Sequence, residues 1–246
     1  MPEIFEDGFW NLISKDLKLR LVEPYIYTVY DNFDSKSSYD RKFGSLYDRV
    51  ACNPLYNRII WGYLTKNYAS LTLDALASSK EGWVLDAGCG SLAFTAKTYT
   101  QYHERPIVFL DQSLKLIRIA KSRLIKLNGE FPENMVFVQG DALDLPFNQN
   151  MFTTVISLNL IHVVGDLKGL LSGIRNVLAE NGRISFTTLV KSNNMRDRYL
   201  KLWEEKGELI SRDIEEICKI FDELGMPVKH DIAGSLASIY YGSESA

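Results

Sequence analysis

The stretch that most constrains the fold is residues 83–95, WVLDAGCGSLAFT, in which a short apolar run meets an acid and then two glycines. Large and β-branched residues without alternation are typical of a strand that is buried on both faces of a parallel sheet. Gly88 and Gly90 permit a sharp turn and a close backbone approach that side chains would block. We therefore expect a strand, a tight turn that presents free backbone amides, and a helix, with a ligand bound at the turn.

Two nucleotide-binding interpretations compete for this turn. The segment GCGSLA, residues 88–93, satisfies the loose dinucleotide pattern in which alanine replaces the third glycine. An NAD-dependent oxidoreductase is therefore one alternative. Asp86 argues against it, because a carboxylate aimed into the loop repels a pyrophosphate and supports a cationic amino-acid ligand. For the glycines alone, a purely structural turn is an equally good interpretation.

The run Asp86-Ala87-Gly88-Cys89-Gly90 resembles motif I of class I S-adenosylmethionine-dependent methyltransferases, whose usual form is Asp-x-Gly-x-Gly-x-Gly. Leu92 stands where that family usually has its third glycine. The order of motifs from about residue 80 to residue 242 is similar to that family as well. The resemblance implies an α/β fold for domain 81–246: a Rossmann-like, seven-stranded, mostly parallel sheet with an antiparallel last strand. It also implies S-adenosyl-L-methionine as cofactor and S-adenosyl-L-homocysteine as product.

Acids are expected at the ends of the next two strands. Asp111 follows the run IVFL. Its separation from Asp86 in the sequence is close to the roughly 20-residue offset at which an acid meets ribose hydroxyls. A carboxylate accepts two hydrogen bonds from a vicinal diol. The segment GDALDLPF, residues 140–147, resembles the family segment in which an acid receives the adenine amino group, and Asp141 is that acid. The expected cofactor-binding residues are Asp86, Ala87, Gly88, Gly90, Asp111, Gln112, Asp141, Ala142 and Asn159.

Residues 1–80 lack this strand and helix rhythm and are rich in aromatic side chains. We expect a helical extension with helices over residues 8–21 and 54–70, the second capped by Asn53. The segment FGSLYDRVACNPLYNRIIWGY is similar to the N-terminal lid of small-molecule methyltransferases, including quinone-biosynthesis C-methyltransferases. Tyr39 and Tyr47 are therefore candidate substrate residues, although aromatics of this kind also pack helical layers onto sheets.

Residues 152–158, FTTVISL, predict a further strand, and related methyltransferases commonly carry an acid where this chain has Thr153. Asn159 and His162 follow at the carboxyl edge of the sheet, where open α/β folds bind ligands. His162 is a candidate for orienting the substrate or accepting a proton. A structural histidine is the more common alternative.

Composition narrows the partners. A formal net charge of −3 gives no global attraction for a phosphate backbone, which disfavours nucleic acid. The three cysteines lack a CxxC pair or zinc-ligand spacing, so we expect reduced thiols in a cytoplasmic protein. The histidines are scattered, and we propose no metal site. No apolar run reaches the length of a transmembrane helix, and no secretory signal is visible.

The sequence thus predicts methylation of a small, partly apolar or aromatic molecule. One alternative is the NAD-dependent oxidoreductase. The other is a non-catalytic S-adenosylmethionine-binding or partner-regulating module, which is suggested by the departures from the family pattern at Leu92 and Thr153. Oligomeric state does not follow from the sequence.

Overall fold

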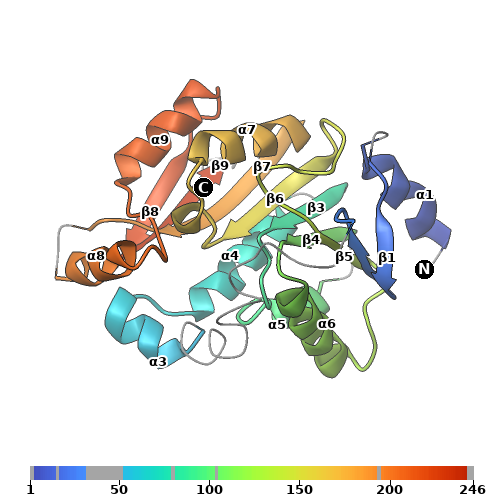
Figure 1. Cartoon of the computed structure of the whole chain (residues 1–246), viewed down its shortest axis with the longest axis horizontal. Coiled ribbons are helices and arrows are strands. Elements are labelled where there is room, and N and C mark those ends of the chain that lie inside the picture. Colours follow the sequence, from blue (N-terminus) through green and yellow to red (C-terminus); the bar gives the residue numbers. More distant parts are fainter. Residues whose placement is uncertain are drawn as a thin grey trace.

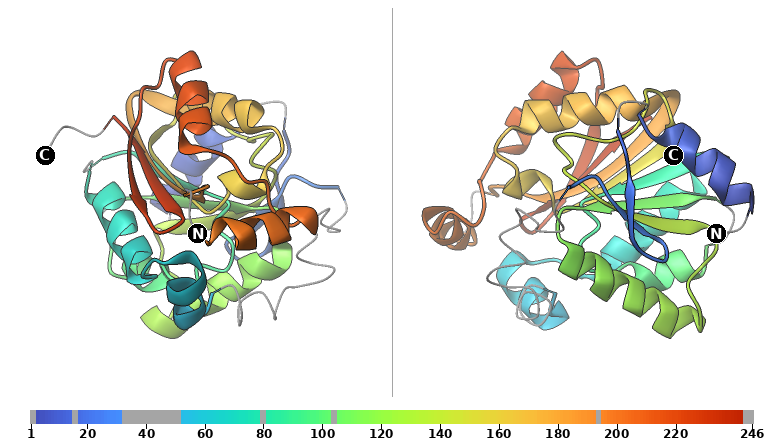
Figure 2. Two further views of the ribbon diagram at one scale, coloured as in Figure 1. Left: turned by 90° about the vertical axis from the view of Figure 1, so that its left-hand side faces the viewer. Right: turned by 45° about the vertical axis from the view of Figure 1, so that its right-hand side comes forward.

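The computed structural model describes residues 3–14, 17–31, 52–78, 81–102, 105–192 and 195–242, with side chains from residue 8 onward. In these ranges a nine-stranded sheet lies between two layers of helices (Figure 1). The strand order is β1-β2-β5-β4-β3-β6-β7-β9-β8. Figure 2 shows α7 and α9 on one side of the sheet and α6 on the other.

The centre of the sheet is parallel. It consists of β3 (Trp83–Ala87), β4 (Ile107–Asp111), β5 (Met135–Gln139), β6 (Phe152–Leu158) and β7 (Leu178–Leu189). β9 (Leu236–Tyr241) runs antiparallel to β7, and β8 (Lys229–Ala233) pairs with β9. The predicted α/β fold, its parallel sheet and its antiparallel last strand are confirmed. Because the chain adds β4 and β5 on one side of β3 and β6 on the other, a crevice opens at the carboxyl ends of these strands.

The N-terminal region contributes two strands that the sequence analysis did not predict. Helix α1 spans Glu3–Leu12, and β1 (Arg20–Glu23) and β2 (Ile26–Thr28) form a hairpin. β2 pairs in parallel with β5, with Ile26 opposite Phe137. The predicted helix over residues 8–21 therefore ends too late, and the sheet has nine strands rather than seven. Pro24 disfavours a helix there, and the buried Ile26, Tyr27 and Thr28 suit a pleated strand.

The predicted helix over residues 54–70 is divided in two. Asn53 caps α3 (Pro54–Tyr56), since its Oδ1 accepts hydrogen bonds from the amides of Leu55 at 2.9 Å and Tyr56 at 3.2 Å. A π-helical turn, η2 (Asn57–Trp61), follows and ends at Gly62, which adopts a φ of 76°. Helix α4 (Lys66–Ala77) then leads toward β3.

The remaining helices cover the two faces of the sheet. They are α5 (Ala96–Thr100), α6 (Leu114–Asn128), the 3₁₀ turn η3 (Ile161–Val163), α7 (Leu167–Val177), α8 (Asp197–Glu205) and α9 (Ile214–Glu223). Ser113 caps α6, because its Oγ accepts a hydrogen bond from the Leu116 amide at 3.1 Å. One apolar core joins the sheet to α1, α7 and α9, and a second joins it to α4, α5 and α6. The two cores fix the strand ends that surround the crevice.

Candidate active site

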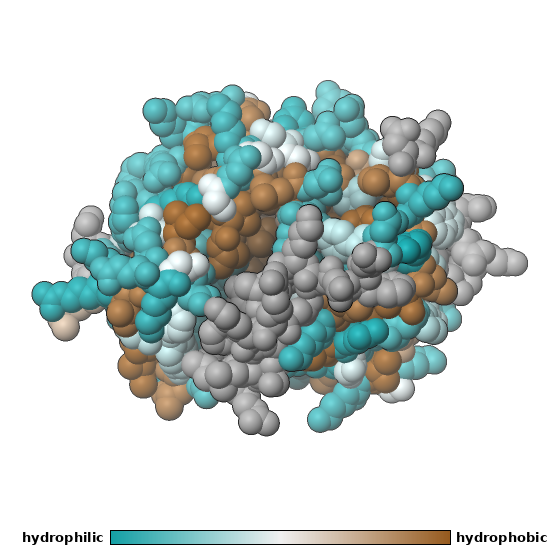
Figure 3. Space-filling view, viewed as in Figure 1, coloured by the Kyte–Doolittle hydropathy of each residue, from teal (hydrophilic) through white to brown (hydrophobic). Residues whose placement is uncertain are grey.

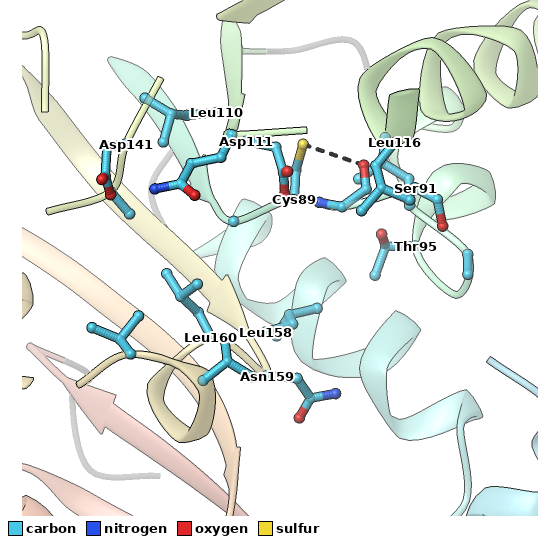
Figure 4. Close-up of a pocket in the computed structure, with 18 of the residues that line it drawn as sticks. Cys89, Ser91, Thr95, Leu110, Asp111, Leu116, Asp141, Leu158, Asn159 and Leu160 are labelled. Carbon is cyan, nitrogen blue, oxygen red and sulfur yellow. Dashed lines mark hydrogen bonds between the residues drawn. The ribbon is translucent and has the colours of Figure 1, made fainter. Parts of the chain in front are cut away.

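A cavity of about 480 Å³ lies at the carboxyl ends of β3, β4, β5 and β6. Its volume suits a small-molecule site. Figure 4 shows Cys89, Asp111 and Asp141 along one side, with Leu158, Asn159 and Leu160 along the other. Figure 3 shows a hollowed, apolar surface over the carboxyl end of β6. We call the first side the acid side and the second the apolar side.

The glycine loop after β3 forms the base of the acid side. Gly88 and Gly90 adopt φ values of 77° and 55°, as the tight turn requires. Leu92, where the resemblance leads one to expect a third glycine, adopts a φ of 53°. Its side chain is buried against the core beneath α6. A leucine in the left-handed region costs about 1–2 kcal/mol, which this burial offsets.

The loop does not present the free amides that the sequence analysis predicted. The amides of Gly88 and Cys89 both donate to the Leu110 carbonyl, at 2.8 and 3.0 Å. The Gly90 amide donates to Asp111 Oδ2 at 2.8 Å. The end of β4 therefore satisfies the donors that a pyrophosphate would need. A β-carbon added at Gly90 would meet no atom within 4 Å, so the space beside the loop is open.

Asp86 is the last acid before the glycine loop and is 2% exposed. Its Oδ2 accepts a hydrogen bond from the Tyr99 hydroxyl at 2.7 Å, and its buried Oδ1 has no hydrogen-bond partner. Burial raises the pKa of Asp86 to about 7, opposed by the Tyr99 hydrogen bond and reinforced by Asp111. A buried, unsatisfied carboxylate oxygen is costly unless a cation or a donor approaches it.

Asp111 and Asp141 line the cavity at the ends of successive strands. Asp111 accepts from the Gly90 amide and, through Oδ1, from the Ser113 amide at 2.8 Å. These bonds orient the carboxylate, which has about four lone-pair sites in all. Asp141 Oδ1 accepts from the Leu143 amide at 2.9 Å, which fixes the turn after β5.

The structure places the other predicted cofactor residues around these acids. Gln112 and Ala142 line the cavity, together with Gly88, Gly90 and Asn159. Ala87 and Asp86 do not line it and lie in the strand beneath. Tyr30 was missed by the sequence analysis. This half-buried tyrosine of the N-terminal region lies near Asp141 and Asp111, and burial, followed by these carboxylates, raises its pKa to about 12.

The apolar side comes from segments far apart in the sequence. Leu158 is the last residue of β6, and Leu160, Val163 and Val164 follow that strand. Tyr68 belongs to α4, and Phe94 lies at the end of the glycine loop. Arg212 holds the turn after β6 in place. Its guanidinium donates to the carbonyls of Ile161 and Val164 at 2.8 Å and of Gly165 at 3.1 Å. The sequence analysis gave Arg212 no role in the site.

His162 is not among the residues that line the cavity. Its Nδ1 accepts a hydrogen bond from the Leu189 amide at 3.2 Å, so the ring proton resides on Nε2 when the imidazole is neutral. Burial and then the Arg212 charge lower its pKa to about 4. Its predicted role in catalysis and substrate binding stays a prediction. Tyr39 and Tyr47 lie outside the described residues.

Residues 78–237 match a family model that is described as a methyltransferase domain. The chain belongs to the methyltransferase-domain family. This confirms the predicted class I S-adenosylmethionine-dependent methyltransferase and agrees with its Rossmann-like sheet. The match leaves the NAD-dependent alternative without support.

Individual relatives are more distant. A demethylmenaquinone methyltransferase of Thermotoga maritima is 29% identical over 167 residues, covering 64% of this chain and 69% of that enzyme. An uncharacterized protein of Methanocaldococcus jannaschii is 29% identical over 128 residues, which is 52% of this chain and half of that protein. The solved structure of a putative S-adenosyl-L-methionine-dependent methyltransferase of Methanococcus maripaludis matches with a TM-score of 0.61 at 17% identity, covering 87% of this chain and 97% of that one.

The methyltransferase cavity fits S-adenosylmethionine by its own chemistry. The carboxylate of Asp86, buried in the strand beneath the glycine loop, favours a cation near that loop, and the ligand's amino-acid part carries an ammonium group. The open space at Gly90 leaves room for a ligand close to the backbone. Asp111 and Asp141 supply acceptors for hydroxyl and amino groups at the neighbouring strand ends.

Thr153 does not touch this site. It lies at the amino end of β6, where its Oγ1 accepts from Arg105 Nη2 at 2.7 Å. The departure from the family pattern at Thr153 therefore leaves the cavity unchanged. Across the described ranges, no cluster of three or more metal-ligating side chains occurs, and no helix has the length and apolarity to cross a bilayer.

Proposed function

We propose that this protein transfers the methyl group of S-adenosylmethionine to a small, partly apolar, ring-bearing acceptor. The observation that carries the proposal is the division of one cavity into an acid side and an apolar side. Strand-end acids suit the polar adenosyl and amino-acid groups, and an apolar wall suits an acceptor with little charge.

The methionine sulfonium supplies an electrophilic methyl group, and its C–S bond breaks as the acceptor atom forms its new bond to carbon. In the proposal, the glycine loop receives the ligand's ammonium end above the buried Asp86 carboxylate, Asp111 accepts from the ribose hydroxyls, and Asp141 accepts from the adenine amino group. The apolar side excludes water and aligns the acceptor, which is the main requirement of such a displacement. The acceptor proton passes to solvent.

The acceptor class draws on the Thermotoga relative, which is named for demethylmenaquinone. We propose a reduced quinone or a similar aromatic ring as the type of acceptor. We also propose that residues 1–80 cover domain 81–246, which the packing of α4 and of the β1–β2 hairpin supports. The thiols of Cys89 and Cys218 support a cytoplasmic location.

Calorimetric titration of the purified protein with S-adenosylmethionine, S-adenosylhomocysteine and NAD tests the proposal. Both adenosyl ligands bind the wild type, and NAD does not. Asp111→Ala weakens both adenosyl affinities by roughly a hundredfold, because a ribose acceptor and the Gly90 amide partner are lost together. Asp144→Ala is the matched control, since this acid does not line the cavity. Failure of the wild type to bind either adenosyl ligand refutes the proposal.

A second outcome separates catalysis from simple binding. Adenosyl binding without methylation of any reduced quinone or phenol tested favours the non-catalytic module. Binding of NAD in place of the adenosyl ligands would instead support the NAD-dependent oxidoreductase as the function.

A further inference from the structure

Tyr68 is an aromatic residue of the cavity wall that lies outside the family motifs in the sequence. It comes from α4, lines the cavity and is only 1% exposed. Its ring stacks on Phe94, with 5.2 Å between the ring centroids and 20° between the planes. Tyr68, Phe94 and Leu158 all line the cavity, so the apolar side contains aromatic as well as aliphatic side chains.

A directed chain of hydrogen bonds fixes the Tyr68 hydroxyl. Asn159 Nδ2 donates to the Tyr68 oxygen at 2.6 Å, and the Tyr68 hydroxyl donates to the Tyr63 oxygen. The Tyr63 hydroxyl donates to Asn57 Oδ1 at 2.7 Å, and Asn57 Nδ2 donates to the Asn53 carbonyl at 2.9 Å. Because every donor points the same way, the bonds polarise one another. Burial raises the pKa of Tyr63 to about 12, so its proton stays in place at neutral pH.

Asn159 adopts a left-handed backbone conformation at its place in this hydrogen-bond chain. Its φ is 62°, and its amide donates to the Thr187 carbonyl at 2.9 Å. Asparagine tolerates the left-handed region better than most residues do. The turn directs the Asn159 amide group onto Tyr68 at the end of β6, where the cavity opens. Phenylalanines at positions 63 and 68 would fill the same space without any of these polar groups.

Tyr68 also stands on the correct side of the cavity for an acceptor. Asn159, its donor, lies opposite Asp111 and Asp141 (Figure 4). If the acids hold the adenosyl ligand, the Tyr68 ring and hydroxyl face the molecule that receives the methyl group. Methyl transfer needs the acceptor atom in line with the breaking bond, so a rigid wall at this place affects the rate.

We propose that Tyr68 positions a planar, ring-bearing methyl acceptor, and that Asn159 and Tyr63 are positioning residues that act through it. This inference rests on the proposed function and narrows its acceptor to a flat ring with a polar substituent. The acceptor's ring packs against Phe94 and Tyr68, and its hydroxyl substituent donates a hydrogen bond to the Tyr68 oxygen, whose own proton is donated to Tyr63.

The test uses 1,4-naphthohydroquinone as the probe, under anaerobic conditions, with radiolabelled S-adenosylmethionine as donor. Tyr68→Phe raises KM for the probe by roughly tenfold or lowers kcat by a similar factor, since a hydrogen bond to the acceptor is lost. The affinity for S-adenosylhomocysteine stays within about twofold in calorimetry, because the acid side is untouched.

Two further variants test the positioning chain. Tyr63→Phe and Asn159→Asp each shift the same kinetic constants by roughly threefold, because they loosen Tyr68 without removing it. Aspartate keeps the shape and the left-handed backbone of Asn159 but removes its donor. Tyr102→Phe is the control: it deletes a partly buried phenol hydrogen bond, 2.8 Å to the Leu76 carbonyl, away from the cavity.

Two results overturn the inference. In the first, Tyr68→Phe leaves KM and kcat within about twofold of the wild type while it lowers Tm as much as Tyr102→Phe does. This result would mean that the hydrogen-bond chain contributes to packing alone. The other is a wild-type protein that binds S-adenosylhomocysteine but neither binds 1,4-naphthohydroquinone nor methylates it when S-adenosylmethionine is the donor. Intact S-adenosylhomocysteine binding in that case leaves the cofactor part of the proposed function standing, so the two failures are distinguishable.

Discussion

The two sides of the cavity are built in opposite ways. On the acid side, Asp111 and Asp141 line the cavity at consecutive strand ends, and Asp86, buried in β3 beneath the glycine loop, keeps one oxygen without a partner. On the apolar side, α4, the turn after β6 and the segment before α9 meet, and the buried charge is the Arg212 guanidinium, which donates to three carbonyls. The acid side comes from short sequence patterns, and its buried carboxylate lacks a counterion. The apolar side joins segments that are distant in the sequence, and its buried guanidinium has hydrogen-bond partners within the protein.

This difference separates ligand binding from folding. A charge that the protein does not neutralise lowers the stability of the ligand-free chain and strengthens the binding of a cation. A charge that the protein fully satisfies contributes to stability and shapes a wall. Substitutions on the two sides should therefore change stability in opposite directions.

The largest expected effect is a gain in stability for Asp86→Asn. Folding raises the pKa of Asp86 from 3.8 to about 7, so the folded chain holds a proton that the unfolded chain has released. The free energy of unfolding therefore falls as pH rises between these values. At pH 8 the full penalty applies, and Asp86→Asn raises the unfolding free energy of the ligand-free protein by up to about 4 kcal/mol.

Urea unfolding at pH 8 and pH 4 measures this gain, which should nearly vanish at the lower pH. The same variant weakens S-adenosylmethionine binding, measured by calorimetry at pH 8. Asp144→Asn, an acid of the neighbouring turn, serves as the control and shows neither effect. Equal stability of Asp86→Asn and the wild type at both pH values would erase the contrast between the two sides.

On the apolar side, we expect Arg212→Met to lower the stability of the protein. Three backbone carbonyls lose their donor, and the free energy of unfolding falls by roughly 3 kcal/mol. S-adenosylhomocysteine affinity is retained where the folded protein is populated. Lys191→Met removes an exposed pair with Asp213 instead and changes stability by less than about 1 kcal/mol.

Arg212→Met also changes the titration of His162. Removing the guanidinium charge raises the pKa of His162 above its value of about 4, while burial keeps it below 6.5. An NMR titration of the imidazole carbon resonances in wild type and variant measures this change. An unaltered His162 pKa would mean that Arg212 does not act on this turn electrostatically.

The smallest effect is expected at Leu92, where the usual ranking of alanine and glycine should be reversed. Both Leu92→Ala and Leu92→Gly lose a buried side chain, but only glycine relieves the φ of 53°. Leu92→Gly should be more stable than Leu92→Ala by about 1 kcal/mol. In α6, the pair Leu116→Ala and Leu116→Gly should show the ordinary order, with glycine less stable by about 1 kcal/mol. Thermal unfolding of the four variants decides the matter.

The acid side was largely predictable from the sequence because each of its residues follows a short apolar run. Strand ends fix the place of Asp111 and Asp141, and Asn53 and Ser113 cap the helices that the pattern predicts. The free amides at the glycine loop were wrongly predicted. Local pattern does not show that Leu110 and Asp111, on the next strand, satisfy those donors.

The apolar side was less predictable because its contacts join distant segments. Nothing near Tyr68 in the sequence points to Asn159, and nothing near Arg212 points to the turn after β6. The hairpin of β1 and β2 was missed for a related reason. Its pairing partner is β5, more than a hundred residues away, as the 111-residue separation of Thr28 and Gln139 illustrates.

That hairpin has a practical consequence for anyone who shortens the chain. A fragment that begins at the family match, residue 78, would lack β2 and expose the backbone donors and acceptors of β5 along a buried, apolar strand. Bare edges of this kind recruit other strands. The minimal piece that stays monodisperse on purification therefore begins before β1, and boundaries taken from sequence similarity alone would yield aggregates.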